Sequence, residues 1–107
     1  MAGINRGDVR HCLFASPDKY RPVVVVTRES AIEYLTTITV APISSTIRNT
    51  PSQVRLDGSD GMKKPCVVNL HNLVTVPQEL LGERVAHLGE RKMREICDAL
   101  RFSFGCD

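Results

Sequence analysis

A chain of 107 residues is long enough for one compact domain with a single modest core. Its hydrophobic fraction of 42% is ordinary for a globular protein, and 14 Lys and Arg against 12 Asp and Glu leave a net charge of +2. The overall charge therefore does not by itself indicate a nucleic-acid-binding protein, although local clusters of cations still can. No apolar run approaches the roughly 20 residues of a membrane span, and the first residues lack the apolar stretch of a signal peptide. We expect a soluble cytoplasmic protein with one domain over residues 1–107.

The first half of the chain predicts short strands separated by loops. Residues 8–14 alternate in polarity as a half-buried strand does, and residues 23–27 form a β-branched run typical of a buried central strand. Residues 36–41 are again β-branched, and Pro42 is expected to end their regular pairing. The following segment is rich in hydroxyl side chains and turn formers, which predicts an exposed loop at residues 43–51.

The second half predicts more strands and then a helix. Strands are expected over residues 53–56, 66–70 and 84–88, residues 74–76 are a weaker candidate, and residues 57–61 form a clear turn. From Glu90 the apolar residues fall at helical spacing; they are Met93, Ile96, Cys97, Leu100 and Phe104. Five or six short strands with one terminal amphipathic helix predict a mainly β protein with some α structure. A small antiparallel barrel is the economical architecture, because closure removes exposed strand edges.

Four cysteines, Cys12, Cys66, Cys97 and Cys106, are widely spaced and form no Cys-x-x-Cys pair, so we interpret them as reduced thiols. A mixed metal site is an open alternative and would use His11, Cys12, Cys66 and His71. Single buried cysteines are common in strands and cores, so packing is the favoured interpretation.

Four segments, in this order, carry a family resemblance: residues 6–9 (Arg-Gly-Asp-Val), 21–26 (Arg-Pro-Val-Val-Val-Val), 40–45 (Val-Ala-Pro-Ile-Ser-Ser) and 61–68. With the terminal helix they resemble the MazF/PemK family of toxins over nearly the whole chain. The resemblance implies an SH3-like barrel with a C-terminal helix, the fold shared by MazF, PemK and CcdB, and it implies a homodimer. It also implies sequence-specific cleavage of single-stranded RNA, which inhibits translation and growth until a cognate antitoxin blocks the toxin.

In that family the arginine before the valine-rich strand and a hydroxyl residue after the Ala-Pro segment form the core of the active site, which here implies Arg21 and Ser44. Attack by an RNA 2′-hydroxyl on its adjacent phosphate builds negative charge on the phosphoryl oxygens. A guanidinium presents a planar fork to two such oxygens, and a loop hydroxyl can hold the phosphate. Local sequence alone also allows a surface arginine and a turn-stabilising serine, and the neighbouring Ser45 leaves a one-residue ambiguity.

His71 is the candidate general acid or base. The family commonly has an acidic residue after the valine pair, and here His71 takes that position. Histidine exchanges protons near neutral pH, whereas arginine stays protonated. The alternative is a structural histidine hydrogen-bonded beside the sheet. His11 and His87 match no motif, and we predict that they face solvent or pack.

The matched segments offer Arg21, Ser44 and His71 but no carboxylate cluster, which a two-metal nuclease would need. The substrate's own 2′-hydroxyl is then the nearest nucleophile. We expect cleavage without metal or cofactor, leaving a 2′,3′-cyclic phosphate or 3′-phosphate and a 5′-hydroxyl.

A second set of polar side chains is predicted to contact RNA, because phosphate contacts position a strand without reading its bases. Its members are Lys19, Ser45, Arg48, Arg55, Lys63, Lys64 and Asn69. A set of merely solvated charges is the alternative. The loop over residues 15–20 is shorter than in the family and lacks glycine, which leaves open whether it gates the site.

Two binding proteins compete with the ribonuclease interpretation. A CcdB-like gyrase poison shares the fold and carries a Trp-Gly-Ile ending, but this chain has no tryptophan and ends in Gly-Cys-Asp. A noncatalytic SH3-like adaptor builds its peptide groove from aromatics, of which this chain has only three Phe and two Tyr. Both features favour the ribonuclease.

Overall fold

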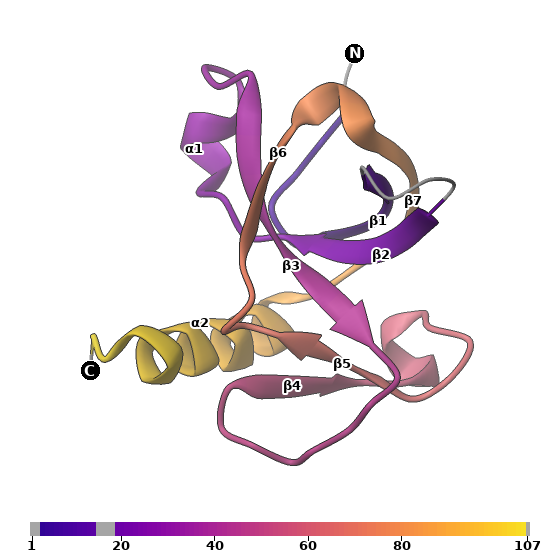
Figure 1. The fold of residues 1–107 in the computed structure, drawn as a ribbon, viewed down its shortest axis with the longest axis vertical. Coiled ribbons are helices and arrows are strands. Elements are labelled where there is room, and N and C mark those ends of the chain that lie inside the picture. Colours follow the sequence, from indigo (N-terminus) through magenta and orange to yellow (C-terminus); the bar gives the residue numbers. More distant parts are fainter. Residues whose placement is uncertain (1–2, 15–18, 107) are drawn as a thin grey trace.

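A computed structural model describes residues 3–14 and 19–106, apart from the side chain of Lys19. Seven antiparallel strands form one curved sheet, and a long C-terminal helix lies against it (Figure 1). The strands are β1 (Asp8–Phe14), β2 (Lys19–Val25), β3 (Thr37–Ser44), β4 (Gln53–Leu56), β5 (Cys66–Asn69), β6 (Val74–Pro77) and β7 (Leu81–His87). The helices are α1 (Glu29–Ile32) and α2 (Glu90–Phe104), with single 3₁₀ turns η1 (Gly58–Asp60) and η2 (Gln78–Leu80). The predicted mainly β fold with a terminal helix is confirmed.

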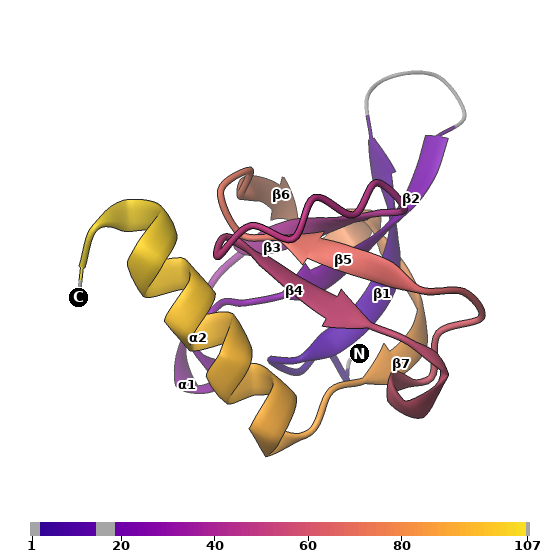
Figure 2. The same ribbon diagram turned by 90° about the horizontal axis from the view of Figure 1, so that it is seen from below.

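The strand order is β4-β5-β3-β2-β1-β7, and β6 pairs with β3. Strand β3 is the central strand of this arrangement because it pairs with β2 on one side and with both β6 and β5 on the other. The strands curl around as a half-barrel, as the two perpendicular views show (Figures 1 and 2).

The predicted end of pairing at Pro42 is wrong. Strand β3 continues through Pro42, which lies opposite Val23 of β2, and ends at Ser44. On its other side, pairing with β6 stops at Val40 and pairing with β5 starts at Ile43. Pro42 therefore occupies the switch between two partner strands, where a missing N–H breaks no ladder. The exposed loop begins two residues later than expected.

The core has two parts, one on each face of the sheet. One cluster joins Val24 and Val68 of the sheet to Ile96 of α2. The other cluster lies on the opposite face and contains Val23, Val25 and Ile32, the last of these from α1. Successive valines of residues 23–26 thus serve both clusters, which explains why this run is apolar without alternation.

Helix α2 buries Ile96 and Ala99 against the sheet and ends at Gly105, whose φ of 65° suits a residue without a Cβ. The backbone N–H of Cys106 donates to the carbonyl of Arg101 and closes the last turn. Phe104, at the end of the predicted apolar face, lies in the last turn of α2 and is 56% exposed. Figure 2 shows that this last turn extends past the edge of the sheet. Within residues 3–14 and 19–106, no helix is both long and apolar enough to cross a membrane.

Strand β7 starts three residues earlier than predicted. Its pairing with β1 contains two register shifts, between Val9 and Arg10 and between Arg10 and Cys12. These shifts interrupt the alternation of side chains that a sequence pattern relies on.

Candidate active site

The structure brings Arg21 and Ser44 to neighbouring strands at the same end of the sheet. Val23 lies opposite Pro42 at the end of the antiparallel pairing of β2 and β3, and Arg21 and Ser44 each lie two residues beyond this pair. Residues two apart on a strand project from the same face. The two predicted core residues of the active site therefore lie on one face, just past the same end of this pairing.

The same register continues over two further strands. Ser44 lies opposite Val67 of β5, and Val67 lies opposite Arg55 of β4. Ser44, Val67 and Arg55 form one row across three strands, and we call these three residues together with Arg21 the active-site row. Two strand spacings separate Ser44 from Arg55, or about 10 Å. Val67 is fully buried, Ser44 is half-buried, and the two arginines at the ends are exposed.

Cations without protein partners surround this row. Within residues 3–14 and 19–106, the side chains of Arg21 and Arg55 make no hydrogen bond or ion pair. The same holds for the exposed side chains of Arg48, Lys63 and Lys64, and the two lysines lie just before β5, at the end of the sheet where the row is. Asp57 is near enough to Arg55 for the guanidinium to help lower its pKa, but the exposed positive charges at this end of the sheet can still attract phosphates.

The Ser44 hydroxyl is oriented by its own loop. Its Oγ accepts the backbone N–H of Thr46 at 3.0 Å, so the hydroxyl proton is free to be donated to a ligand. Ser45 is exposed and lies just past the end of β3.

Asn69 lies on the same face as the row and is half-buried. Gln53 lies opposite Asn69 in the pairing of β4 and β5. Two residues further along the same strands, Arg55 lies opposite Val67. The Gln53 Nε2 donates to Asn69 Oδ1 at 2.7 Å, and the Gln53 Oε1 accepts the backbone N–H of Arg48 at 2.8 Å. Gln53 was not predicted as a site residue. Its partners lie 5, 7 and 16 residues away in the sequence, so no local pattern marks it.

His71 is not a member of the active-site row. It is exposed in the turn after β5, four residues beyond Val67, and its Nδ1 is 3.1 Å from the Oγ of the buried Ser52. This contact matches the structural alternative for His71, and a role in proton transfer stays a prediction.

Two parts of the expected site fall partly or wholly outside the described residues. The backbone of Lys19 begins β2 opposite Phe14, but its side chain lies outside them. The loop whose gating was left open includes residues 15–18, which also lie outside them.

The cysteines of the alternative metal site are separated by the sheet. Cys12 belongs to the core cluster with Val23, and Cys66 belongs to the cluster with Val68 on the other face. Burial raises the pKa of both thiols above the ordinary value, and nearby Asp60 and Asp57 raise that of Cys66 further. Neutral buried thiols fit the packing interpretation.

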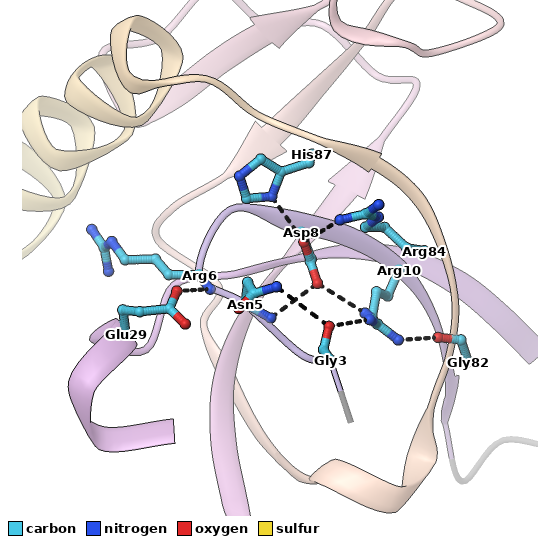
Figure 3. A network of polar contacts seen from close by, with 9 residues as sticks. All are labelled: Gly3, Asn5, Arg6, Asp8, Arg10, Glu29, Gly82, Arg84 and His87. Atoms are coloured by element: carbon cyan, nitrogen blue, oxygen red, sulfur yellow. Dashed lines mark hydrogen bonds and ion pairs between the residues drawn. The ribbon is translucent and has the colours of Figure 1, made fainter. Parts of the chain in front are cut away.

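A second polar cluster, the Asp8 cluster, lies where β1 begins (Figure 3). Asp8 is fully buried, and its carboxylate accepts the Asn5 N–H at 3.0 Å, Arg10 Nε at 3.2 Å and His87 Nδ1 at 2.8 Å, with Arg84 at 3.8 Å. The neighbouring Gly7 has φ of 92°, and a Cβ there would lie 3.3 Å from the Leu88 carbonyl. The Arg-Gly-Asp-Val segment is thus a structural junction, and His87 is one of its partners.

Comparison with known proteins places this chain in a family. Residues 5–104 match the family described as "PemK-like, MazF-like toxin of type II toxin-antitoxin system". The chain is 39% identical over 102 residues to a probable endoribonuclease MazF5 of Mycobacterium tuberculosis, covering 94% of this chain and 93% of that protein.

Solved structures agree. The Mycobacterium tuberculosis toxin MazF-mt6 superposes with a TM-score of 0.85 at 32% identity, covering 94% of this chain and 98% of that one. A mycobacterial endoribonuclease in complex with its cognate antitoxin superposes with a TM-score of 0.88 over 98% of both chains; at 22% identity it supports the fold alone. These matches do not favour the CcdB-like alternative. The chain therefore belongs to the PemK-like, MazF-like family of toxins of type II toxin–antitoxin systems.

Proposed function

We propose that this protein is the toxin of a type II toxin–antitoxin pair and acts as a metal-independent endoribonuclease on single-stranded RNA, with Arg21 and Ser44 at its catalytic centre. The observation that carries the proposal is that both residues lie on one face, just past the same end of the β2–β3 pairing, near cations that have no hydrogen bond or ion pair within the described residues. A guanidinium beside a hydroxyl donor is suited to a phosphate whose oxygens gain negative charge.

The chemistry needs no nucleophile from the protein. The 2′-oxygen forms a bond to phosphorus and gives up its proton, and the bond from phosphorus to the 5′-oxygen breaks as that oxygen is protonated. Arg21 stabilises the charge that develops on the nonbridging oxygens, and the Ser44 hydroxyl donates a hydrogen bond to one of them. The products are a 2′,3′-cyclic phosphate, or the 3′-phosphate that follows its hydrolysis, and a 5′-hydroxyl. The active-site row contains no carboxylate that could hold a divalent cation.

Proton transfer requires a group that can give and take a proton, and His71 remains our candidate. Its ring is exposed, and Ser52 engages one nitrogen, which leaves the other nitrogen for exchange with substrate or water. The route from His71 to the scissile phosphate would run along the strand face that carries Asn69.

Arg48, Arg55, Lys63 and Lys64 then bind the phosphates on either side of the cut, with Lys19, Ser45 and Asn69 as further contacts. Such contacts make affinity fall steeply with salt. The toxin acts as a homodimer in the cytoplasm and stops growth by cutting RNA needed for translation.

The antitoxin partner follows from the same unpaired charges. A segment with acidic and apolar residues would neutralise the cations and cover Arg21. The family description includes an antitoxin, and the mycobacterial relative was solved in complex with its own. Saturating antitoxin should therefore abolish RNA binding and cleavage together. Cleavage that continues in the saturated complex would contradict occlusion.

The decisive experiment incubates the pure protein with a mixed RNA pool in excess EDTA and sequences the cleaved ends. We expect cuts at a short preferred sequence with 5′-hydroxyl termini. A substrate with a single 2′-deoxy nucleotide on the 5′ side of the scissile bond should bind and remain intact. Efficient cutting of that substrate, or a strict need for magnesium, would overturn the mechanism.

A further inference from the structure

Gln53, the first residue of β4, connects the segment after Ser44 to β5 through one side-chain amide. Its Oε1 accepts the backbone N–H of Arg48 at 2.8 Å. Its Nε2 donates to the backbone carbonyl of Thr46 at 3.3 Å and to the Asn69 Oδ1 at 2.7 Å. Both N–H groups of this amide and one lone pair of its oxygen are thus engaged within the described chain.

The two backbone partners determine which way the Gln53 amide points. The N–H of Arg48 can only donate, so it must face Oε1, and the carbonyl of Thr46 can only accept, so it must face Nε2. The second proton of Nε2 then points at Asn69 and requires an acceptor there. Gln53 therefore holds the Asn69 amide with its Oδ1 toward Gln53 and its Nδ2 pointing away from Gln53.

The outward group of Asn69 is consequently its Nδ2, a pure donor. Within the described residues Nδ2 has no hydrogen-bond partner, yet no buried side-chain nitrogen or oxygen lacks one, so Nδ2 is open to solvent. Asn69 is two residues from Val67 of the active-site row and on the same face, about 7 Å along the strand. A strand of RNA held at the row would pass within reach of this donor.

Ser44 depends on the same segment. The N–H of Thr46 donates to the Ser44 hydroxyl, and the carbonyl of Thr46 accepts from Gln53. Thr46, which lies between Ser44 and β4, thus has both its backbone N–H and its carbonyl in hydrogen bonds. Loss of the Gln53 amide would release Thr46 and with it the orientation of the Ser44 hydroxyl.

We propose that Gln53 is a positioning residue that holds the Ser44–Arg48 segment against β5 and fixes Asn69 so that its Nδ2 donates to an acceptor atom of bound RNA. This inference rests on the proposed function. The acceptor is either a base edge or a phosphate oxygen, and the two sources predict different outcomes.

A first test measures hydrogen exchange of the Arg48 backbone amide in the free protein, independently of any cleavage. Gln53→Ala should increase its exchange rate by roughly tenfold, the loss of one hydrogen bond, while Gln53→Glu should keep it protected because a carboxylate still accepts. Gln78 supplies the matched control, since its Nε2 donates to the carbonyls of Ile32 and Leu35 elsewhere in the fold. If the exchange rate of the Arg48 amide is unchanged in Gln53→Ala, Gln53 does not hold this segment and the inference fails.

The second test compares cleavage of the mixed RNA pool by Gln53→Glu and Gln78→Glu. A carboxylate at position 53 cannot donate, so the Asn69 amide should turn its Nδ2 inward and present Oδ1 to the RNA. If a base supplies the acceptor, the preferred nucleotide changes at one position of the cleavage sequence. If a phosphate does, KM rises roughly tenfold for all sequences, since one hydrogen bond is lost.

Asn69→Ala should reproduce the effect, and combining it with Gln53→Glu should add little. Rates and sequence preferences equal to those of Gln78→Glu would overturn the inference. If the wild-type protein cuts no RNA while the Arg48 amide behaves as expected, Gln53 still holds the Ser44–Arg48 segment. The proposed function and the contact of Asn69 with RNA then fail.

Discussion

The Asp8 cluster and the active-site row both hold charged side chains at the ends of strands, and they differ in how those charges are paired. Asp8 is fully buried, and four groups surround its carboxylate. Arg21 and Arg55, at the two ends of the row, are exposed and have no partner within the described residues.

This difference separates structural charges from charges available to a ligand. A buried carboxylate is tolerated only when donors replace its water, so the Asp8 cluster belongs to the fold. Exposed cations that make no hydrogen bond or ion pair within the described residues contribute little to the fold and are available for an anionic substrate. Substitutions should therefore affect stability in the first region and activity in the second.

The largest effect is expected for Arg21→Ala. Loss of the guanidinium should lower kcat by about 10²- to 10³-fold, the usual consequence of removing a group that stabilises transition-state charge. Stability should change by less than about 0.5 kcal/mol, because the side chain is exposed and unpaired. Arg84→Ala is the matched control, since Arg84 is also largely exposed but faces Asp8. Near-normal turnover of Arg21→Ala would show that the exposed charge of Arg21 does not serve catalysis.

The second largest effect concerns stability. Asp8→Ala leaves Arg10 and His87 without their carboxylate, and removing one member of a buried ionic network costs about 3 kcal/mol. Urea denaturation should show a lower midpoint with an unchanged slope. The fraction that stays folded should cut RNA at the wild-type rate. Lost cleavage at unchanged stability would assign Asp8 to function instead.

Ser44→Ala should lower kcat by roughly tenfold, less than Arg21→Ala, because a neutral hydrogen bond contributes less than a charge-assisted one. Ser45→Ala is the neighbouring control and should be nearly silent. Single-turnover rates of the two variants decide the register. A large defect in Ser45→Ala alone would move the catalytic hydroxyl by one residue.

A smaller effect is expected for His71→Asn, which can keep a contact with Ser52 and loses the proton exchange. The pH dependence of cleavage should flatten near neutrality while the fold persists. An unchanged pH profile would leave His71 with the structural role that its contact with Ser52 already supports.

The smallest effect is expected for Asp57→Asn, in the turn between β4 and β5. The side chain and the backbone N–H of Ser59 hold the pKa of Asp57 below its ordinary value. A lowered pKa stabilises the fold above the ordinary carboxyl range, and this contribution is lost as pH falls through the lowered value. The acid midpoint of unfolding should therefore differ slightly between wild type and variant, with equal cleavage at neutral pH. A large cleavage defect would place Asp57 in RNA binding.

Local patterns predicted most elements because they are properties of neighbouring residues. The valine run at residues 23–26 predicted a buried strand, and the apolar spacing after Glu90 predicted a helix. The continuation of the strand through Pro42 was missed because the pairing there depends on which strands flank it.

The sequence by itself determined the mainly β class with a terminal helix from periodicity, and its ordered motifs pointed to the family and, through the resemblance, to Arg21 and Ser44. Only the tertiary structure decided that Arg21 and Ser44 lie on one face at the end of the β2–β3 pairing, that His71 lies outside the active-site row, and that Gln53 joins the segment after Ser44 to Asn69. Strand register sets these relations, and register arises from pairing between segments far apart in the chain. No pattern within one segment encodes which residue of another segment lies opposite.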